Sequence, residues 1–333
     1  GKVFPEGIVG GKMKIRLKGL YLVLLLTITC SALSPCIAYA QVDNPHNAIY
    51  VNNGSGNDDY DGFTPEKPKK TLQAALDAVP ERGTVLLANG EYIAPLKWNR
   101  EPFFTIDKDV AICGQDPSKT LIKPTQRIYA KWSDDENDVW VESAFRVDHG
   151  VNFILRNVTL DLSKAFLCDF VIDSNGKLDA ENCKFTGRIR SAGGGNFKNC
   201  TFSSRNYYGS GIWNMNGRSN IMKCTFTGNE NGNSGIINGK DALCTTSDCK
   251  FTKNQNDKLF VPDHGYNPLF GLFWDEGSPG VFSPIVNEGS CTVTNSMFIN
   301  NTLREGGAIR NIEAGKITIK SCDFTGNVAT GDK

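Results

Sequence analysis

Oxygen-bearing side chains recur at alternate positions along residues 57–62, which read Asn-Asp-Asp-Tyr-Asp-Gly. The oxygens of Asn57, Asp59 and Asp61 match the first half of a calcium-binding loop, since Ca²⁺ takes oxygen ligands at such spacing. The glutamate that closes a loop of this kind is missing, because Pro68 stands in its place. The sequence therefore predicts either a calcium site at Asn57, Asp59 and Asp61 or a turn held by Asx hydrogen bonds, and the missing glutamate favours the turn.

Aromatic side chains gather in the stretch 256–289, which includes Tyr266, Phe273 and Trp274. Such a stretch reads as a loop that leaves a regular scaffold, and loops of this kind often carry binding residues. The rings of Tyr266, Phe273 and Trp274 are candidates for stacking on sugar ligands. Packing of the same rings against the rest of the protein is the alternative, and we favour it.

Two turns pair an acid with a histidine, at Asp148-His149 and at Asp263-His264. Hydrolysis of a glycosidic bond requires two carboxylates that face one cleft, and the sequence places no such pair. The chain has 11 cysteines, but their spacing does not match the C-x2-C pairs of a zinc site. We therefore assign no catalytic residue and no cofactor other than the calcium considered above, and the sequence favours a protein without catalytic activity.

A repeated pattern, C-x-F-x-x-N, organises the second half of the chain. Complete or partial copies begin at Cys183, Cys200, Cys224, Cys249, Ser296 and Cys322, with an apolar forerunner at Val158. Neighbouring copies lie 17 to 26 residues apart, apart from a step of 47 residues before Ser296. Periods of this size indicate stacked structural units. We interpret the long step as two periods, one of them obscured by the insertion at 256–289.

Apolar residues alternate on both sides of the Cys position, which is the signal of a strand with one buried face. A step of three residues between the two alternating stretches predicts a short bend. A further strand with the pattern Gly-x-Ile precedes several copies, as at 211–214 and 235–238. Each repeat thus holds about three short strands, and stacked coils advance by about 4.8 Å. The sequence predicts an all-β, right-handed parallel β-helix with internal ladders of Cys, Phe and Asn, the Asn suiting the turns because it tolerates a left-handed backbone.

The repeats resemble those of the chlamydial polymorphic outer membrane proteins, whose motifs are F-x-x-N and G-G-A-I. The match is best at residues 306–309, at Phe298, and at Phe324 with Asn327. It covers roughly residues 150–333, and similar repeats occur in adhesin-like surface proteins. The resemblance implies a solenoid displayed at a cell surface. It specifies the fold well and the function poorly.

The N-terminal part of the sequence predicts a leader followed by a cap. Residues 1–12 precede the first Met, and we interpret them as non-native sequence upstream of the true start. Residues 13–40 have the basic region, the apolar stretch and the A-x-A site of a signal peptide. Residues 41–125 form the cap and the first coils, and residues 126–333 form the repeats, with the insertion at 256–289. The next apolar strand is due soon after Lys333, so we expect a C-terminal truncation.

A helix is expected over 72–79, where Leu72, Ala75, Leu76 and Val79 share one face. This block resembles the start of secreted β-helix proteins of the pectate-lyase-like kind, in which a helix closes the first coil. An uncovered β-helix end exposes apolar core and strand edges, so the physical reason for a cap is plain. We therefore expect an N-terminal capping helix.

Charge and composition exclude some classes of function. Without residues 1–40 the chain has 31 basic and 35 acidic residues, which gives no positive field for nucleic acid. No apolar stretch reaches the roughly 20 residues of a membrane span. The sequence predicts a secreted or cell-surface, adhesin-like protein that acts as a binding surface or stalk, with glycans or proteins of a host or cell surface as partners. The alternative is a polysaccharide lyase or glycoside hydrolase on the same scaffold.

Overall fold

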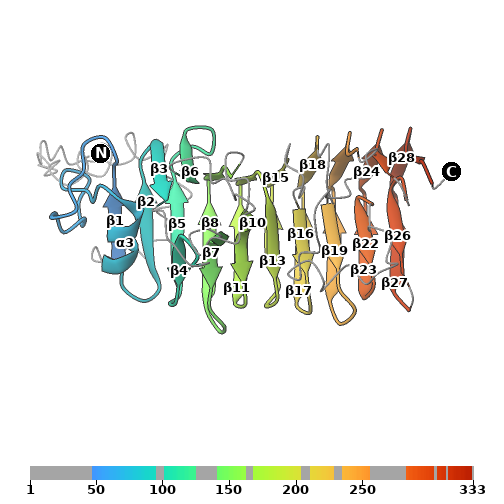
Figure 1. Cartoon of the computed structure of the whole chain (residues 1–333), viewed down its shortest axis with the longest axis horizontal. Helices are drawn as coiled ribbons and strands as arrows, with labels where there is room; N and C mark the ends of the chain where they lie inside the picture. The colour runs from blue at the N-terminus through green and yellow to red at the C-terminus, as the bar shows by residue number, and fades with distance from the viewer. Residues whose placement is uncertain are drawn as a thin grey trace, which may run out of the picture.

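The computed structural model describes residues 47–94, 101–124, 141–162, 168–203, 211–228, 235–255, 283–303, 306–312 and 314–331. In this part of the chain, the strands stack into a right-handed parallel β-helix (Figure 1), which confirms the predicted fold class. From β2 to β26 each coil contributes one strand to each of three long parallel sheets, so the rod lengthens by one strand per coil. The predicted signal peptide at 13–40 and the stretch 1–12 lie outside the described residues.

The three sheets are named here A, B and C. Sheet A contains β1 (Ala48–Val51), β2 (Gly83–Leu87), β5 (Val110–Gly114), β8 (Asn152–Arg156), β11 (Lys177–Glu181), β14 (Gly195–Lys198), β17 (Arg218–Met222), β20 (Leu243–Ser247), β23 (Ser290–Thr294) and β27 (Lys316–Lys320). Sheet B contains β3 (Gly90–Ala94), β6 (Thr120–Pro124), β9 (Thr159–Leu160), β12 (Lys184–Phe185), β15 (Thr201–Phe202), β18 (Thr225–Thr227), β21 (Lys250–Thr252), β24 (Met297–Ile299) and β28 (Asp323–Thr325). Sheet C contains β4 (Phe104–Ile106), β7 (Val141–Val147), β10 (Cys168–Ser174), β13 (Arg188–Ser191), β16 (Gly211–Asn214), β19 (Gly235–Asn238), β22 (Ile285–Asn287) and β26 (Ile309–Asn311). A short pair, β25 (Thr302–Leu303) and β29 (Val328–Ala329), completes the last coils.

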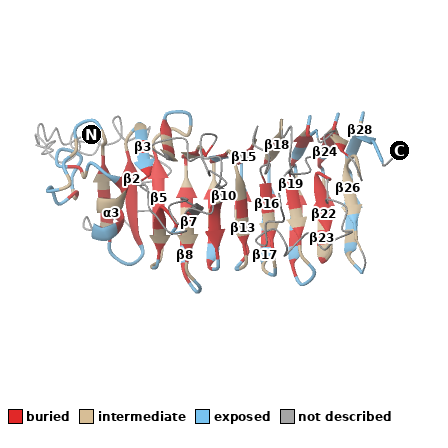
Figure 2. Cartoon of the chain, viewed as in Figure 1, coloured by how far each residue is buried: buried red, intermediate tan, exposed pale blue. Residues whose placement is uncertain are grey.

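The predicted ladders are present inside the rod. The repeat phenylalanines stack along sheet B from Phe185 to Phe324, with neighbouring ring centroids 4.7–5.1 Å apart. The same column continues toward the N-terminus as Leu160, Ile122 and Tyr92. One contiguous apolar core follows the rod (Figure 2), and it becomes exposed at the last coil, where Phe324 is 48% exposed. The core is therefore built by columns of equivalent residues.

The bend between sheets A and B depends on a left-handed residue. The position directly before each Cys has a positive φ, as at Asn157, Asn182 and Asn199, each between 53° and 55°. Asn adopts this conformation more readily than most residues, which explains its frequency there. The Asn of the C-x-F-x-x-N pattern has a different role from the predicted one. Asn254 and Asn301 are not left-handed; their side chains are buried and bond to one another.

A second ladder of amides lies inside sheet C. The side-chain amide of Asn214 donates to Asn238 Oδ1 at 2.9 Å, and that of Asn238 donates to Asn287 Oδ1 at 2.8 Å. Each amide also donates to a backbone carbonyl of the neighbouring turn, such as Asn214 to Gly217 O. These side chains thus satisfy buried carbonyls that the turn leaves without backbone partners. They hold the C-to-A turn against the rod.

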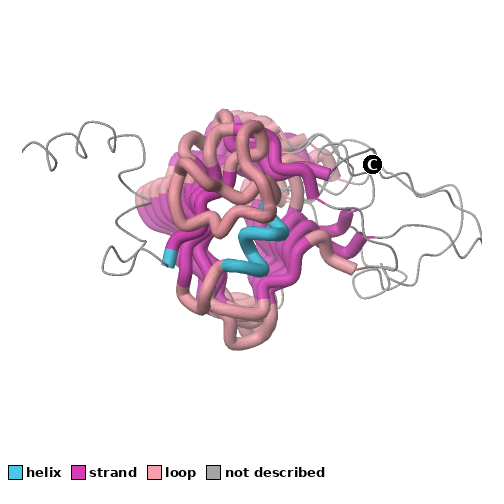
Figure 3. The backbone as a smooth tube through the Cα atoms, turned by 90° about the vertical axis from the view of Figure 1, so that its left-hand side faces the viewer, coloured by secondary structure: helices cyan, strands magenta, loops and turns pink. Residues whose placement is uncertain are grey.

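The N-terminal end carries the predicted cap. Helix α3 (Leu72–Ala78) lies across the end of the rod (Figure 3), with Leu72, Ala75 and Leu76 buried. Thr71 caps the helix, since its hydroxyl oxygen accepts a hydrogen bond from the Ala74 amide at 3.2 Å. The first coil is thereby closed to water.

The 47-residue step is one coil, which corrects our interpretation of it as two periods. Phe251 pairs directly with Phe298, and Cys244 pairs directly with Cys291, so no additional coil lies between them. Strand pairing requires adjacent backbones, and it therefore decides the register. The regular coil resumes with β22 at Ile285–Asn287, inside the predicted insertion 256–289. The residues between 256 and 282 lie outside the described chain.

Candidate functional site

Each coil has three corners, which are named here by the two sheets that they connect, and these corners differ in length. From β8 onward the A-to-B corner always has two residues, and the C-to-A corner has two to four residues throughout. The B-to-C corner varies from two residues, 186–187, to 32 residues, 253–284. The large variation in chain length therefore lies at the corner from which the strands of sheet C begin, whereas the other corners stay within two to five residues. In repeat proteins, insertions on one face often mark the binding face.

Sheet C also carries an outer surface of mixed chemistry. One outward position on each strand is called here the outer row; β13 has a second outward residue, Arg188. In register, the outer row reads Thr105, Arg146, Asp173, Arg190, Trp213, Ile237, Val286 and Arg310. Because successive strand residues point to opposite faces, this row looks away from the core. Acidic, basic and aromatic groups thus stand side by side at its centre.

Asp173 and Arg190 form a bidentate ion pair in this row. Arg190 Nε donates to Asp173 Oδ1, and Arg190 Nη2 donates to Asp173 Oδ2, both at 2.6 Å. The side chain of Asp173 is 9% exposed, whereas that of Arg190 is 29% exposed. A fork-to-carboxylate geometry orients both groups and strengthens the pair. The pair is therefore a rigid polar unit that solvent reaches from the Arg190 side.

Two aromatic rings complete this group. The guanidinium carbon of Arg190 lies 5.7 Å from the centroid of the Phe170 ring. The Phe170 ring in turn lies 6.2 Å from the Trp213 ring, with their planes inclined by 35°. Both aromatic residues are partly exposed. Asp173, Arg190, Phe170 and Trp213 are called here the sheet C cluster, and they combine an amphipathic platform with oriented hydrogen-bonding groups.

Sequence reasoning did not single out this cluster, although a signal for it exists. Three strands share the pattern of an inward Ile followed by an outward residue and a small polar one: Ile172-Asp173-Ser174, Ile189-Arg190-Ser191 and Ile212-Trp213-Asn214. Aligning the middle position across coils would have placed Asp173, Arg190 and Trp213 next to one another. The unequal steps between these residues, 17 and 23, concealed the alignment.

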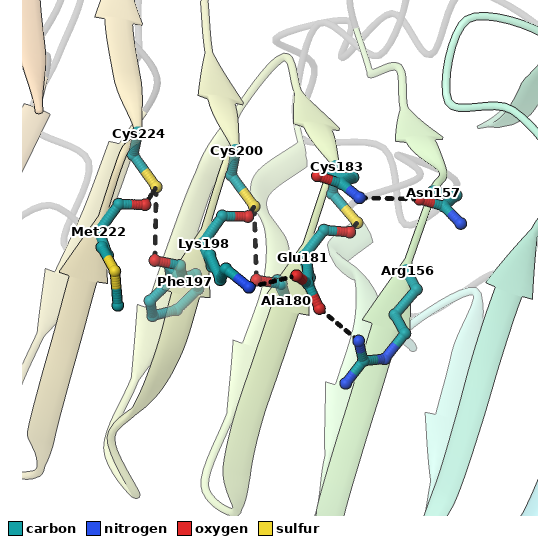
Figure 4. A network of polar contacts seen from close by, with 11 residues as sticks. Arg156, Asn157, Ala180, Glu181, Cys183, Phe197, Lys198, Cys200, Met222 and Cys224 are labelled. Atoms are coloured by element: carbon teal, nitrogen blue, oxygen red, sulfur yellow. Dashed lines mark hydrogen bonds and ion pairs between the residues drawn. The ribbon is translucent and has the colours of Figure 1, made fainter. Parts of the chain in front are cut away.

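The thiols form a buried ladder beside sheet A. In Figure 4 the side chains of Cys183, Cys200 and Cys224 follow one another along neighbouring coils. Cys200 Sγ lies 3.4 Å from Lys198 O and 3.5 Å from Ala180 O, so the thiol bonds to its own coil and to the preceding one. Burial raises the pKa of the Cys183 thiol well above its usual range. All cysteines whose state the structure describes are free thiols, in agreement with the predicted inward ladder.

An ion-pair network covers the outside of the same bend. Glu181 accepts hydrogen bonds from Lys198, at 2.8 Å, and from Arg156 (Figure 4). The bond from Lys198 holds the pKa of Glu181 below its ordinary value, although partial burial acts in the opposite direction, and the charge of Arg156 adds to the lowering. The network joins three successive coils. Its role is to clamp the stack, because every member already has a protein partner.

The residues predicted as a calcium site hold their own loop. Asn57 Oδ1 accepts a hydrogen bond from the Asp59 amide at 3.1 Å, and Asp61 Oδ1 accepts one from the Phe63 amide at 3.0 Å. These are the Asx contacts of the alternative interpretation. Asp58, which the sequence had not singled out, binds the amides of Lys70 and Thr71, both at 2.8 Å. No group of three acidic, Cys or His residues that could hold a metal occurs in the described part of the chain, and calcium binding stays a prediction.

The predicted aromatic ligand-binding residues, Tyr266, Phe273 and Trp274, lie outside the described residues. In sequence they lie between β21 and β22, at a B-to-C corner. Asp148 and His149 lie in a turn, where Asp148 faces Arg146 with 3.7 Å between Oδ1 and Nε. The second acid–histidine pair, at Asp263, is also outside the described residues.

Fold and surface together define a parallel β-helix that presents a polar and aromatic group on one sheet. The chain belongs to the family described as "Protein of unknown function (DUF1565)", whose model matches residues 54–255. Comparison with curated proteins gives no match. No helix among the described residues is long and apolar enough to cross a membrane.

Solved structures similar to the chain include a pectin methylesterase and a pectate lyase. Pectin methylesterase PemA from Erwinia chrysanthemi has a TM-score of 0.44 and 9% identity, with 86% of this chain and 92% of that chain covered. Pectate lyase Pel9A has a TM-score of 0.42 and 13% identity, with 86% and 78% covered. A Geobacillus virus E2 protein, ORF18, has a TM-score of 0.39 and 12% identity, with 97% and 63% covered. At such values the likeness carries no information about activity.

Proposed function

We propose that the protein is a secreted or cell-surface, adhesin-like β-helix that binds ligands of a host or cell surface without transforming them. The observation that carries the proposal is the large length variation at the B-to-C corner, from two to 32 residues, against two to five residues at the other corners. The other two corners stay short along the whole rod. A rigid rod with variable loops along one edge is the arrangement by which repeat proteins build binding surfaces. Secretion is supported by the signal-like sequence at 13–40.

The geometry of the acidic residues favours binding over catalysis. Glycosidases place two carboxylates across one cleft. In the described part of sheet C, the carboxylate of the outer row is Asp173, and its neighbours in register are Arg146 and Arg190. A single carboxylate between two arginines lacks the second acid of that mechanism. The aromatic residues Tyr266, Phe273 and Trp274 remain candidates for the ligand contact at the longest loop.

Binding and turnover can be tested together on the full chain. Purified protein would be incubated with pectin, alginate and host glycans, with both retention and released product measured. We expect retention of at least one ligand with no product, and retention reduced in a Trp274→Ala variant if the longest loop takes part. Product formation from any of these polymers would overturn the proposal in favour of the lyase or hydrolase alternative.

A further inference from the structure

The sheet C cluster lies beside the shortest of the B-to-C corners. The corner that leads into β13, the strand of Arg190, has two residues, 186–187. The corners of the coils on either side have seven residues, 161–167, and eight residues, 203–210. Access to the outer row from the variable corner is therefore least restricted by chain length at Arg190. The cluster therefore lies where the B-to-C corner is shortest.

The polar half of the cluster has hydrogen-bonding capacity left for a ligand. Each carboxylate oxygen of Asp173 accepts one bond from Arg190, and a carboxylate has about four acceptor positions. Arg190 uses Nε and Nη2 for Asp173, and among the described residues Nη1 has no protein acceptor. The pair thus offers an acceptor and a donor in a fixed relative orientation. Two neighbouring hydroxyl groups of a sugar ring match such a pair, one donating to Asp173 and one accepting from Arg190.

The aromatic half supplies an apolar surface beside these groups. Trp213 follows Arg190 in the outer row, one strand further along. Stacked strands are about 4.8 Å apart, which is close to the width of a sugar ring. Amphipathic aromatic residues bind ligands that have one apolar and one polar side, and a pyranose has an apolar C–H face and hydroxyls at its edge. The Trp213 and Phe170 rings and the Asp173–Arg190 pair meet these two requirements at adjacent positions.

The charge of the cluster favours a neutral ligand. Arg190 is neutralised by Asp173 at 2.6 Å, and Arg146, the other basic neighbour in the row, lies 3.7 Å from Asp148. Of the arginines described at this face, Arg146 and Arg190 are paired with carboxylates and Arg188 has a partner as well, so a carboxylated sugar would approach Asp173 without an unpaired cation to compensate the repulsion. Hydroxyl groups carry no such penalty. Neutral sugars are therefore the ligand class that fits.

We infer that Asp173, Arg190, Phe170 and Trp213 form a binding subsite for a neutral pyranose unit of a glycan. The inference rests on the proposed binding function and names its ligand class. The ring stacks on Trp213, and two adjacent hydroxyls bond to the Asp173–Arg190 pair.

The test is isothermal titration of the full chain with cellohexaose, mannohexaose, laminarihexaose and, as the acidic probe, hexagalacturonate. Trp213→Ala removes the platform, and we expect at least about a tenfold weaker binding of the neutral oligosaccharide, the loss typical of an aromatic anchor. Arg190→Lys keeps the charge but loses the planar fork, and we expect about a fivefold loss. Met222→Ala, on the outer face of sheet A and 40% exposed, is the matched control and should change binding by less than about twofold. Circular dichroism of each variant establishes that it folds, and Arg190→Lys remains informative should Trp213→Ala not fold.

The outcomes separate this inference from the function on which it rests. Neutral binding that both variants weaken supports the subsite. Binding of any glycan that neither variant alters overturns the subsite and leaves the proposed function standing, as does preference for hexagalacturonate. Absence of binding to every glycan overturns the subsite as well, and the surface-binding function then depends on protein ligands alone.

Discussion

Phe226 and Phe251 lie one coil apart with their ring centroids separated by 4.7 Å and their planes inclined by 3°. Both rings are fully buried, and each has a further phenylalanine on its other side. The stack runs along the inner face of sheet B and links its successive strands. It is consistent with the recurrence of Phe at this position, because flat rings stack closely between coils that are about 4.8 Å apart.

Truncation inside the stack should be far more damaging than truncation at its end. Phe251→Ala removes a buried ring and two stacking contacts, and we expect a loss of about 3–5 kcal/mol in unfolding free energy. Phe324→Ala, at a residue that is 48% exposed, should cost about 1 kcal/mol. Urea unfolding followed by circular dichroism measures both. Equal losses would show that the stack does not carry the core.

The ladder formed by the side-chain amides of Asn254, Asn301 and Asn327 should be as important for stability as the ring stack. Asn301 donates to Phe251 O at 3.0 Å and to Asn327 Oδ1 at 2.7 Å, and it accepts from the side-chain amide of Asn254 at 2.9 Å. Asn301→Ala leaves these buried groups unsatisfied, at a cost of about 2–4 kcal/mol. The neighbouring Asn300→Gly is the control, because Asn300 is exposed and has a φ of +52° that glycine accepts readily. A midpoint of urea unfolding unchanged in Asn301→Ala would contradict the ladder's role.

One bend carries a residue poorly suited to its backbone. Lys223 has a φ of +54° at the position where the preceding coil has Asn199 and the following coil has Asp248, and its side chain is exposed. Lys223→Asn should stabilise the protein by about 0.5–1 kcal/mol, because Asn tolerates the left-handed conformation better. The reverse change at the equivalent position, Asn199→Lys, should destabilise it by a similar amount. Thermal unfolding of both variants gives the comparison, and shifts in the same direction would refute the explanation.

The Glu181 clamp predicts a defined acid dependence. The pKa of Glu181 in the folded protein is lowered below its ordinary value of 4.5, so the stabilisation is present above the unfolded pKa and is lost as the pH falls through the folded pKa. The melting temperature of Glu181→Gln should lie below that of the parent at pH 7. The difference should shrink as the pH falls below about 4. A difference independent of pH would mean that the charge of Glu181 is not the cause.

Thiol reactivity should report the ladder directly. Cys183, Cys200, Cys224 and Cys249 are buried, whereas Cys322 in the last coil is partly exposed. Since the thiolate is the reactive form and must meet the reagent, native protein treated with iodoacetamide should be alkylated at Cys322 well before the buried thiols. Peptide mass spectrometry identifies the modified residues, and prior unfolding in urea should equalise their rates. Early labelling of Cys224 in native protein would be incompatible with an inward ladder.

The sequence by itself determined the architecture, because a stacked coil repeats its inward side chains. The spacing of Cys, Phe and Asn gave the β-helix, the bend before each Cys and the ladders, and the helical spacing of Leu72, Ala75 and Leu76 gave the cap. All of these depend on the alternation of buried and exposed residues, and this alternation recurs in each repeat. The calcium pattern at residues 57–62 was equally visible, yet the structure uses Asn57 and Asp61 to hold their own turn.

Only the tertiary structure decided what the outer surface brings together. Coil lengths are unequal, so residues in one row stand at unequal distances along the chain, and strand pairing alone aligns Asp173, Arg190 and Trp213. The same pairing showed that the 47-residue step is a single coil. Inward positions must satisfy one packing rule that recurs along the chain, whereas outward positions obey none, so their neighbours become known only when the coils are stacked.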